Sequence, residues 1–124
     1  MWVDRTLEEF GESIGMPGLK FNDQGVVMLT FERMGILFLE RHEEQILMYM
    51  VRKAEHAPLA VFRRALGLCH YQENQPFELH VGLRREDDLV FLVKIPEQEF
   101  ILPTVERALQ FLDYMHGTAV AASA

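Results

Sequence analysis

The sequence predicts an α+β domain built on an antiparallel sheet, in the order helix, strand meander, helix, two strands, helix. Three segments carry apolar residues at intervals of three and four, the spacing of a helix with one buried face. Between them lie short apolar segments separated by turn-forming residues, as in successive strands. No internal repeat or long linker divides the chain, so residues 1–117 are expected to form one domain and residues 118–124 a frayed tail.

The first helix is indicated by a stripe of apolar residues, Val3, Leu7, Phe10 and Ile14, with glutamates on its other side. An aspartate near its start suits the positive end of the helix dipole. Gly15 is a natural C-terminal stop, and a proline follows two residues later.

A meander is predicted next, with strands at 19–21, 26–31, 36–40 and 45–53 and turns at 22–25, 32–35 and 41–44. These strands do not alternate between apolar and polar residues. In the strand at 36–40, for example, both faces are largely apolar. A sheet with one face in water should carry polar residues there, so both faces are expected to be covered.

The second helix is predicted from Pro58, its first residue, to about Cys69. Apolar residues occupy most of its circumference, so most of it should be buried. In so small a domain this implies a subunit interface. The remaining elements are a loop at 71–76, strands at 77–83 and 89–95, a charged turn at 84–88, and a helix at 103–116 ended by Gly117.

Composition excludes several classes of function. The 124 residues carry a net charge of −7, which disfavours nucleic acid and anionic membranes as partners. The single cysteine excludes an internal disulfide framework. No signal peptide or membrane span is visible, so a cytoplasmic protein without membrane insertion is expected. Apolar residues make up 49% of this small chain, which suggests that some of them meet a second chain.

The sequence contains no signature of an enzyme. Its five histidines, at 42, 56, 70, 80 and 116, lack the spacing of metal ligands. Cys69 and His70 are adjacent, but neighbouring residues on a helix point in different directions. The acidic pairs at 43–44 and 86–88 fall in predicted turns, where charge is expected. We therefore expect no catalytic residue, no metal site and no cofactor.

Methionine gives a more specific signal. Met28, Met48 and Met50 are predicted to share one face of the meander with Ile36 and Phe38. One interpretation is ordinary core packing under a helix. The other is a groove for an extended or partly unfolded segment, because methionine adapts to varied apolar partners. Such a segment could also add to a free sheet edge.

Two motifs in this order resemble the class I chaperones of bacterial type III secretion, the family that includes the Tir chaperone. Residues 7–17 read Leu-Glu-Glu-Phe-Gly-Glu-Ser-Ile-Gly-Met-Pro, and residues 19–25 read Leu-Lys-Phe-Asn-Asp-Gln-Gly. The family often has Asp where this chain has Asn22. Within the family, Trp2-Val3 and the segments at 89–93 and 100–103 look similar to the heterodimer-forming subunits that escort the YopN-type secretion gatekeeper.

The resemblance implies a dimeric α+β chaperone in the bacterial cytoplasm, homo- or heterodimeric, that acts without ATP. Its partners would be a second chaperone subunit and a secreted effector or gatekeeper protein, kept soluble through an extended segment. Carried onto this sequence, the cargo-binding residues would be Phe21, Met28, Ile36, Phe38, Met48 and Met50. The dimer interface would consist of Leu59, Val61, Phe62, Ala65, Leu66, Leu68 and Phe77.

Two other hypotheses remain open on the sequence. A dimeric adaptor that recognises a folded partner would show a large, flat patch and little affinity for unfolded segments. A small-molecule enzyme would need a pocket over the sheet, with Tyr49 or His80 as acid or base.

Overall fold

The computed structural model describes residues 2–55, 57–70 and 76–121. The elements in these ranges are α1 (Trp2–Ser13), β1 (Val26–Phe31), β2 (Gly35–His42), β3 (Gln45–Lys53), α2 (Pro58–His70), β4 (Leu79–Arg84), β5 (Asp88–Pro96), a 3₁₀ turn η1 (Glu97–Glu99) and α3 (Leu102–Ala121). The predicted α+β class and element order are confirmed. Most of the predicted loop at 71–76 lies outside the described residues.

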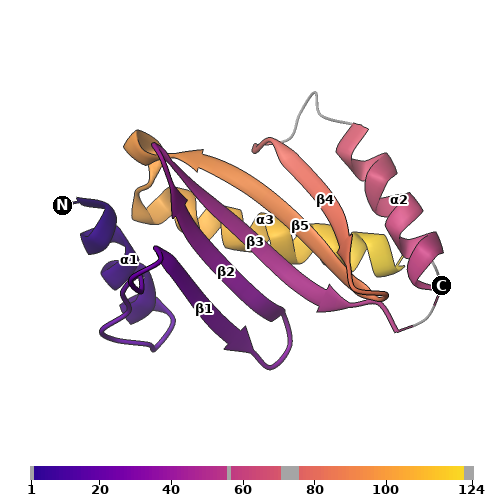
Figure 1. Cartoon of the computed structure of the whole chain (residues 1–124), viewed down its shortest axis with the longest axis horizontal. Helices are drawn as coiled ribbons and strands as arrows, with labels where there is room; N and C mark the ends of the chain where they lie inside the picture. Colours follow the sequence, from indigo (N-terminus) through magenta and orange to yellow (C-terminus); the bar gives the residue numbers. More distant parts are fainter. Residues whose placement is uncertain (1, 56, 71–75, 122–124) are drawn as a thin grey trace.

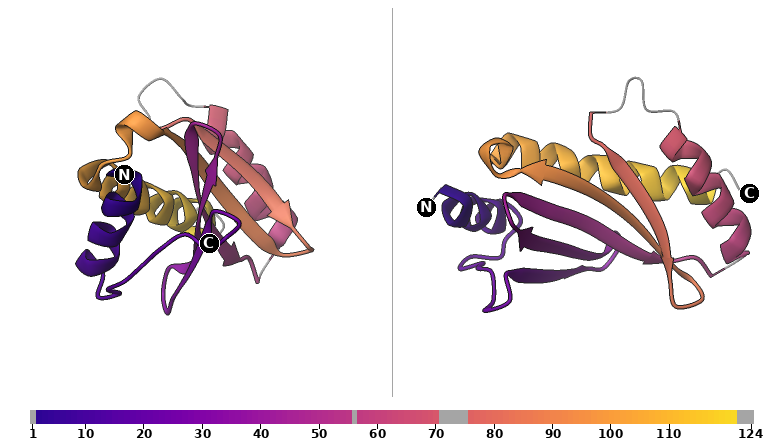
Figure 2. Two further views of the ribbon diagram at one scale, coloured as in Figure 1. Left: turned by 60° about the vertical axis from the view of Figure 1, so that its left-hand side comes forward. Right: turned by 45° about the horizontal axis from the view of Figure 1, so that its top comes forward.

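The five strands form one antiparallel sheet in the order β1-β2-β3-β5-β4. The long helix α3 lies along one face of this sheet, while α1 and α2 lie at its opposite ends (Figures 1 and 2). We call the face against α3 the core face and the opposite face the outer face. No helix lies over the middle of the outer face in the part of the chain that the structure describes.

The hydrophobic core fills the space between the core face and the helices. Alternate residues of each strand point into it, as the two-residue period of a strand requires. The largest fully buried side chains include Phe10, Leu37, Leu39, Met48, Met50, Phe91 and Phe100. From α3 come Val105, Ala108, Leu112, Met115 and Ala119.

The first helix is held by the chain that follows it. Gly15 adopts a φ of +80° and ends α1 as predicted, after which the chain turns back on the helix. The backbone N–H of Met16 donates to the carbonyl of Gly11 at 2.7 Å, and a Cβ at Gly11 would lie 2.7 Å from that of Leu19. Residues 19–21 are described and form no strand, so the short strand predicted there is wrong. They pack on α1 instead of pairing with the sheet.

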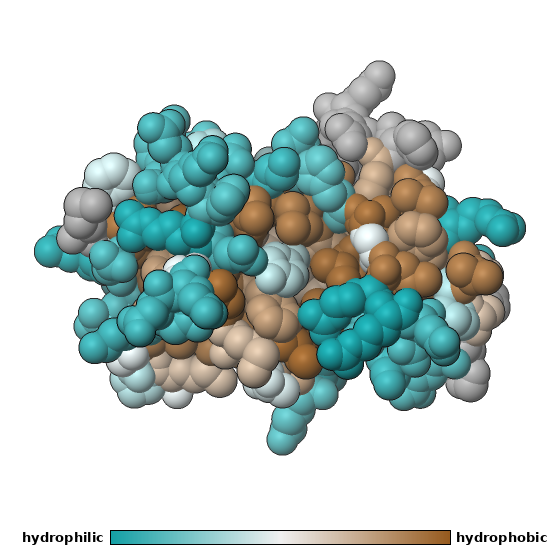
Figure 3. Space-filling view, viewed as in Figure 1, coloured by the Kyte–Doolittle hydropathy of each residue, from teal (hydrophilic) through white to brown (hydrophobic). Residues whose placement is uncertain are grey.

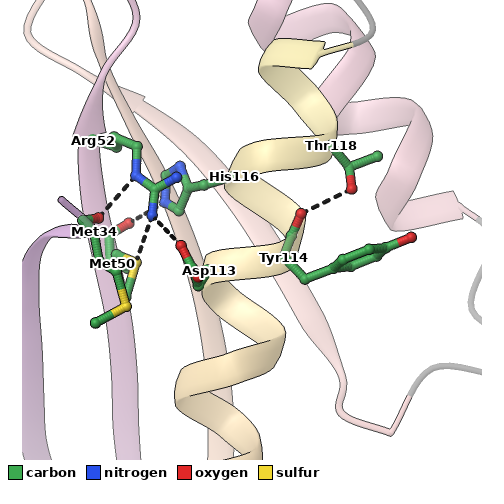
Figure 4. A network of polar contacts seen from close by, with 7 residues as sticks. All are labelled: Met34, Met50, Arg52, Asp113, Tyr114, His116 and Thr118. Carbon is green, nitrogen blue, oxygen red and sulfur yellow. Dashed lines mark hydrogen bonds and ion pairs between the residues drawn. The ribbon is translucent and has the colours of Figure 1, made fainter.

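A polar network fastens α3 to the sheet (Figure 4). The Nε of Arg52 donates to the carbonyl of Met34, and its Nη2 donates to Asp113 of α3, each at 2.8 Å. One guanidinium thus ties β3 both to the loop before β2 and to the helix. Its planar shape, with several donors, suits this double role.

His116 lies beside this network and is fully buried. Its Nε2 donates to the carbonyl of Met50 at 2.8 Å, and its ring meets Phe91 edge-on with centroids 4.9 Å apart. Nδ1 has no hydrogen-bond partner among the described residues. Burial, the largest cause, lowers the pKa of His116 to about 4, so the side chain is neutral in the folded protein near pH 7.

The C-terminal helix is longer than predicted. It runs through Gly117 to Ala121, so the prediction that Gly117 ends it is wrong. Ala119 is fully buried in the core, and this packing offsets the low helix propensity of the glycine. Residues 118–121 are therefore helical, while the last three positions of the predicted frayed tail lie outside the described residues. No helix in the described ranges is long and apolar enough to cross a membrane.

Candidate functional site

The strand register aligns one side chain from each strand across the outer face, and all but the last are aliphatic or aromatic. Successive pairings place Met28, Phe38, Tyr49, Leu92 and His80 side by side, one from each strand. We call these five residues the central row. Met28 is 61% exposed, and Phe38, Tyr49 and Leu92 are half-buried. The central row is thus an apolar strip on β1, β2, β3 and β5 that remains open to a partner, and it ends at the exposed His80 of β4.

A second row runs beside the first, formed by Thr30, Ile36, Val51, Val90 and Gly82. Figure 3 shows apolar surface over the middle of the sheet, where the two rows run, and farther toward β4 and α2. Polar surface covers the side of the molecule that carries α1. The outer face is therefore largely apolar, as predicted, but the chain's own helices leave its middle uncovered.

Phe38 and Tyr49 stack in the central row, with ring centroids 4.9 Å apart and planes inclined by 11°. The Tyr49 hydroxyl donates to Oε2 of Glu40 at 3.1 Å. Burial, followed by this hydrogen bond, raises the pKa of Tyr49. The hydroxyl therefore keeps its proton near neutral pH and is not suited to act as an acid or base there. We call the stacked side chains of Phe38 and Tyr49 the aromatic ledge.

The placement of two predicted cargo residues is wrong. Met48 and Met50 are fully buried on the core face, opposite to Met28, Ile36 and Phe38. A two-residue turn joins β2 to β3, so even-numbered residues of β2 pair with odd-numbered residues of β3. The core interpretation of the methionine signal holds for Met48 and Met50. Only Met28 stands on the outer face.

Phe21, also predicted to bind cargo, lies away from both rows. It is half-buried and lines a hollow of about 580 Å³ between α1 and residues 18–21, with Asp4 and Glu8 on the helix side. The structure thus brings Met28, Ile36 and Phe38 together and sets Phe21 apart from them.

The second helix is only partly exposed. Leu59 is 67% and Leu66 is 40% exposed, while Phe62, Leu68 and Phe77 are half-buried. Val61 and Ala65 are buried in the chain's own core, so the prediction that they lie at a subunit interface is wrong. They sit on the side of α2 that faces the core, opposite to Leu59 and Leu66. Between α2 and the end of α3 lies an apolar hollow of about 520 Å³.

In the part of the chain that the structure describes, the groups that sequence reasoning considered for chemistry do not meet at one site. Among the described residues, no three His, Cys, Asp or Glu side chains are grouped to hold a metal ion. Burial raises the pKa of the Cys69 thiol, which disfavours the reactive thiolate. His80 is exposed at the end of the central row, with its Nε2 3.7 Å from Glu78. Neither His80 nor Tyr49 lines the hollows at α1 and α2.

Sequence reasoning missed two residues of this surface, Leu92 and Tyr49, the latter considered only as an acid or base. The available signal was the length of the turn after β2. When the turn between two antiparallel strands has an even number of residues, even-numbered residues of one strand pair with odd-numbered residues of the other. This places Tyr49, rather than its methionine neighbours, beside Phe38.

Comparison with known proteins agrees with this geometry. A family model described as the type III secretory system chaperone SycN matches residues 2–120. A relative, the chaperone protein SycN of Yersinia enterocolitica, is 25% identical over 112 residues, which is 90% of each chain.

Two solved structures share the fold. The ExsC–ExsE complex matches with a TM-score of 0.80 and 22% identity over 97% of this chain and 92% of the other. The HopA1–SchA chaperone–effector complex matches with a TM-score of 0.71 and 20% identity over 91% of this chain and 89% of the other.

Proposed function

This chain belongs to the type III secretory system chaperone SycN family, and from that premise we propose that its outer face binds an extended segment of a secreted protein. The observation that carries the proposal is the central row, whose members on β1, β2, β3 and β5 form an apolar strip with no described helix over it. An extended segment presents every second side chain to one side, which matches a row of separate apolar contacts.

The proposed binding residues are Met28, Ile36 and Phe38, extended to Tyr49 and Leu92. Phe21 joins them as a second contact beside α1, where the segment would leave the sheet. Binding replaces water on both apolar surfaces and offsets the ordering entropy of the segment, so no ATP is needed. The chain acts by holding its cargo, without a catalytic step, in the bacterial cytoplasm.

We propose further that the protein is a class I-type chaperone that pairs with a second chaperone subunit through α2. The exposed residues Leu59 and Leu66 would form the centre of that interface, with Phe62, Leu68 and Phe77 around them. The cargo proposed for this pair is a YopN-type gatekeeper. This choice is supported by the similarity of Trp2-Val3 and of the segments at 89–93 and 100–103 to the subunits that escort such gatekeepers.

The test is co-expression with genes that neighbour the chaperone gene, followed by mass measurement of the intact complex and limited proteolysis. A short cargo segment should be protected only while the chaperone is bound. The double variant Met28→Glu with Phe38→Ser should remain folded and lose the cargo.

The control is Tyr114→Glu, which places a charge at a residue of α3 that is as exposed as Met28. It should retain the cargo. Full retention by the outer-face variant would contradict the proposed site. Protection of a folded domain in place of a short segment would favour the adaptor hypothesis.

A further inference from the structure

One cation lies over the aromatic ledge of the outer face. Arg84 is the last residue of β4 and pairs across the hairpin with Asp88 of β5. Its Cζ is 5.9 Å from the centroid of the Phe38 ring, although two strands separate β4 from β2. The side chain therefore reaches across the outer face toward the stacked pair.

The outer face between Arg84 and Phe38 carries small, apolar residues. The second row, which includes Gly82, Val90 and Val51, lies between the register positions of Arg84 and Phe38. Val51 is only 4% exposed although it belongs to the outer face. A Cβ at Gly82 would meet nothing within 4 Å, so the outer face is open at this position, two residues before Arg84.

The guanidinium keeps hydrogen-bonding capacity. Nη2 of Arg84 lies 3.6 Å from Oδ2 of Asp88, longer than the roughly 2.7–2.9 Å of a charge-assisted hydrogen bond. A guanidinium has five N–H donors, and the Arg84 side chain is 43% exposed. Contact with an aromatic ring leaves the edge of the guanidinium free to bind a carboxylate with two parallel hydrogen bonds.

We infer that the segment bound on the outer face presents an aspartate or glutamate side chain to Arg84, next to an apolar side chain that packs on Phe38 and Tyr49. The inference rests on the proposed function and adds a charge requirement to it. Side chains two positions apart in an extended segment lie about 6.6–7 Å apart on the same side. One of them can cover the aromatic ledge while the other meets the guanidinium. Arg84 thereby selects among apolar segments by charge.

Fluorescence anisotropy with three labelled synthetic peptides tests the inference. All three alternate Leu and Ser, so that their leucines fall on one side, and they carry Asp, Asn or Lys at one central position on that side. We expect the Asp peptide to bind about fivefold more tightly than the Asn peptide, and the Lys peptide to bind most weakly. Added salt should reduce this preference.

Variants of Arg84 test whether this residue causes the charge preference. Arg84→Gln should bind the Asp and Asn peptides equally, and Arg84→Glu should prefer the Lys peptide. Arg85→Gln removes the same charge from the neighbouring exposed turn residue and should keep the original preference.

Equal binding of the three peptides to the unmodified protein, or an unchanged preference in Arg84→Gln, would overturn the role of Arg84 while leaving the proposed function intact. If none of the three peptides binds, the proposed function falls and the inference falls with it.

Discussion

Phe38 of β2 and Tyr49 of β3 lie opposite each other in the sheet and stack on its outer face with nearly parallel rings. Each ring packs against the other, and the Tyr49 hydroxyl is further fixed by its hydrogen bond to Glu40. A rigid aromatic surface loses little side-chain entropy when a partner packs on it. The pair is therefore suited to be the centre of the proposed binding face.

Substitution by glutamate should destabilise the protein strongly at one methionine of the meander and hardly at all at another. Met48→Glu places a charge at a fully buried position and should unfold the protein or cost more than about 3 kcal/mol. Met28→Glu changes an exposed position and should stay within about 0.5 kcal/mol. Thermal unfolding followed by circular dichroism measures both. Equal losses would contradict the assignment of the two faces.

Substitution by alanine should destabilise the protein at one helical glycine and stabilise it at another. In Gly11→Ala the new methyl group would overlap the chain at Met16 and Leu19, and a loss of about 1–3 kcal/mol is expected. In Gly117→Ala nothing lies within 4 Å, so better helix propensity should add about 0.5–1 kcal/mol. Urea unfolding of both variants gives the comparison. A stabilising Gly11→Ala would show that the loop does not pack on α1.

His116 should make the protein sensitive to mild acid. Its pKa is lowered to about 4, so between pH 6.5 and 4 the unfolded chain binds a proton that the folded chain does not. The stability is complete above pH 6.5 and falls through this window by on the order of 3 kcal/mol. The charged neighbours Arg52 and Asp113 act on this pKa in opposite directions.

Urea unfolding at a series of pH values checks this expectation. His116→Gln can still donate to the carbonyl of Met50 and should flatten the pH dependence. His42→Gln, at an exposed position, serves as the control and should keep it. An unchanged slope in the His116 variant would exclude this histidine as the source.

Charges on α2 should separate the proposed dimer. Leu59→Asp with Leu66→Asp alters two exposed leucines, so the fold should survive while sedimentation shows a monomer. Ile101→Asp, at another exposed apolar residue, is the control and should remain dimeric. A dimer that persists in the double variant would place the interface elsewhere.

Much of the fold could be predicted from local pattern. The strands at 26–31 and 45–53 have the predicted bounds, because turn residues flank both of them. Residues 19–21 have the composition of a strand, but their position is decided by contact with Gly11, a tertiary effect that a local pattern does not contain. Helix α3 passes through Gly117 for the same kind of reason, since Ala119 is buried beyond it.

The site was harder to predict than the fold. The apolar character of both sheet faces is visible in the sequence, but their assignment depends on register, and an error of one position exchanges every side chain between faces. Arg84 is a further case. Arg84 and Phe38 are distant in the sequence and lie on strands that do not pair. Nothing in the residues around Arg84 therefore predicts its contact with the Phe38 ring.

The position of α3 after all five strands in the chain affects how the protein is made. Five of its side chains complete the core, and its Asp113 and His116 bond to Arg52 and to the Met50 carbonyl. While the ribosome is still adding this helix, the finished strands lack its cover on their core face. Stable folding therefore waits until α3 has been made, and until then the nascent chaperone is itself an aggregation-prone polypeptide.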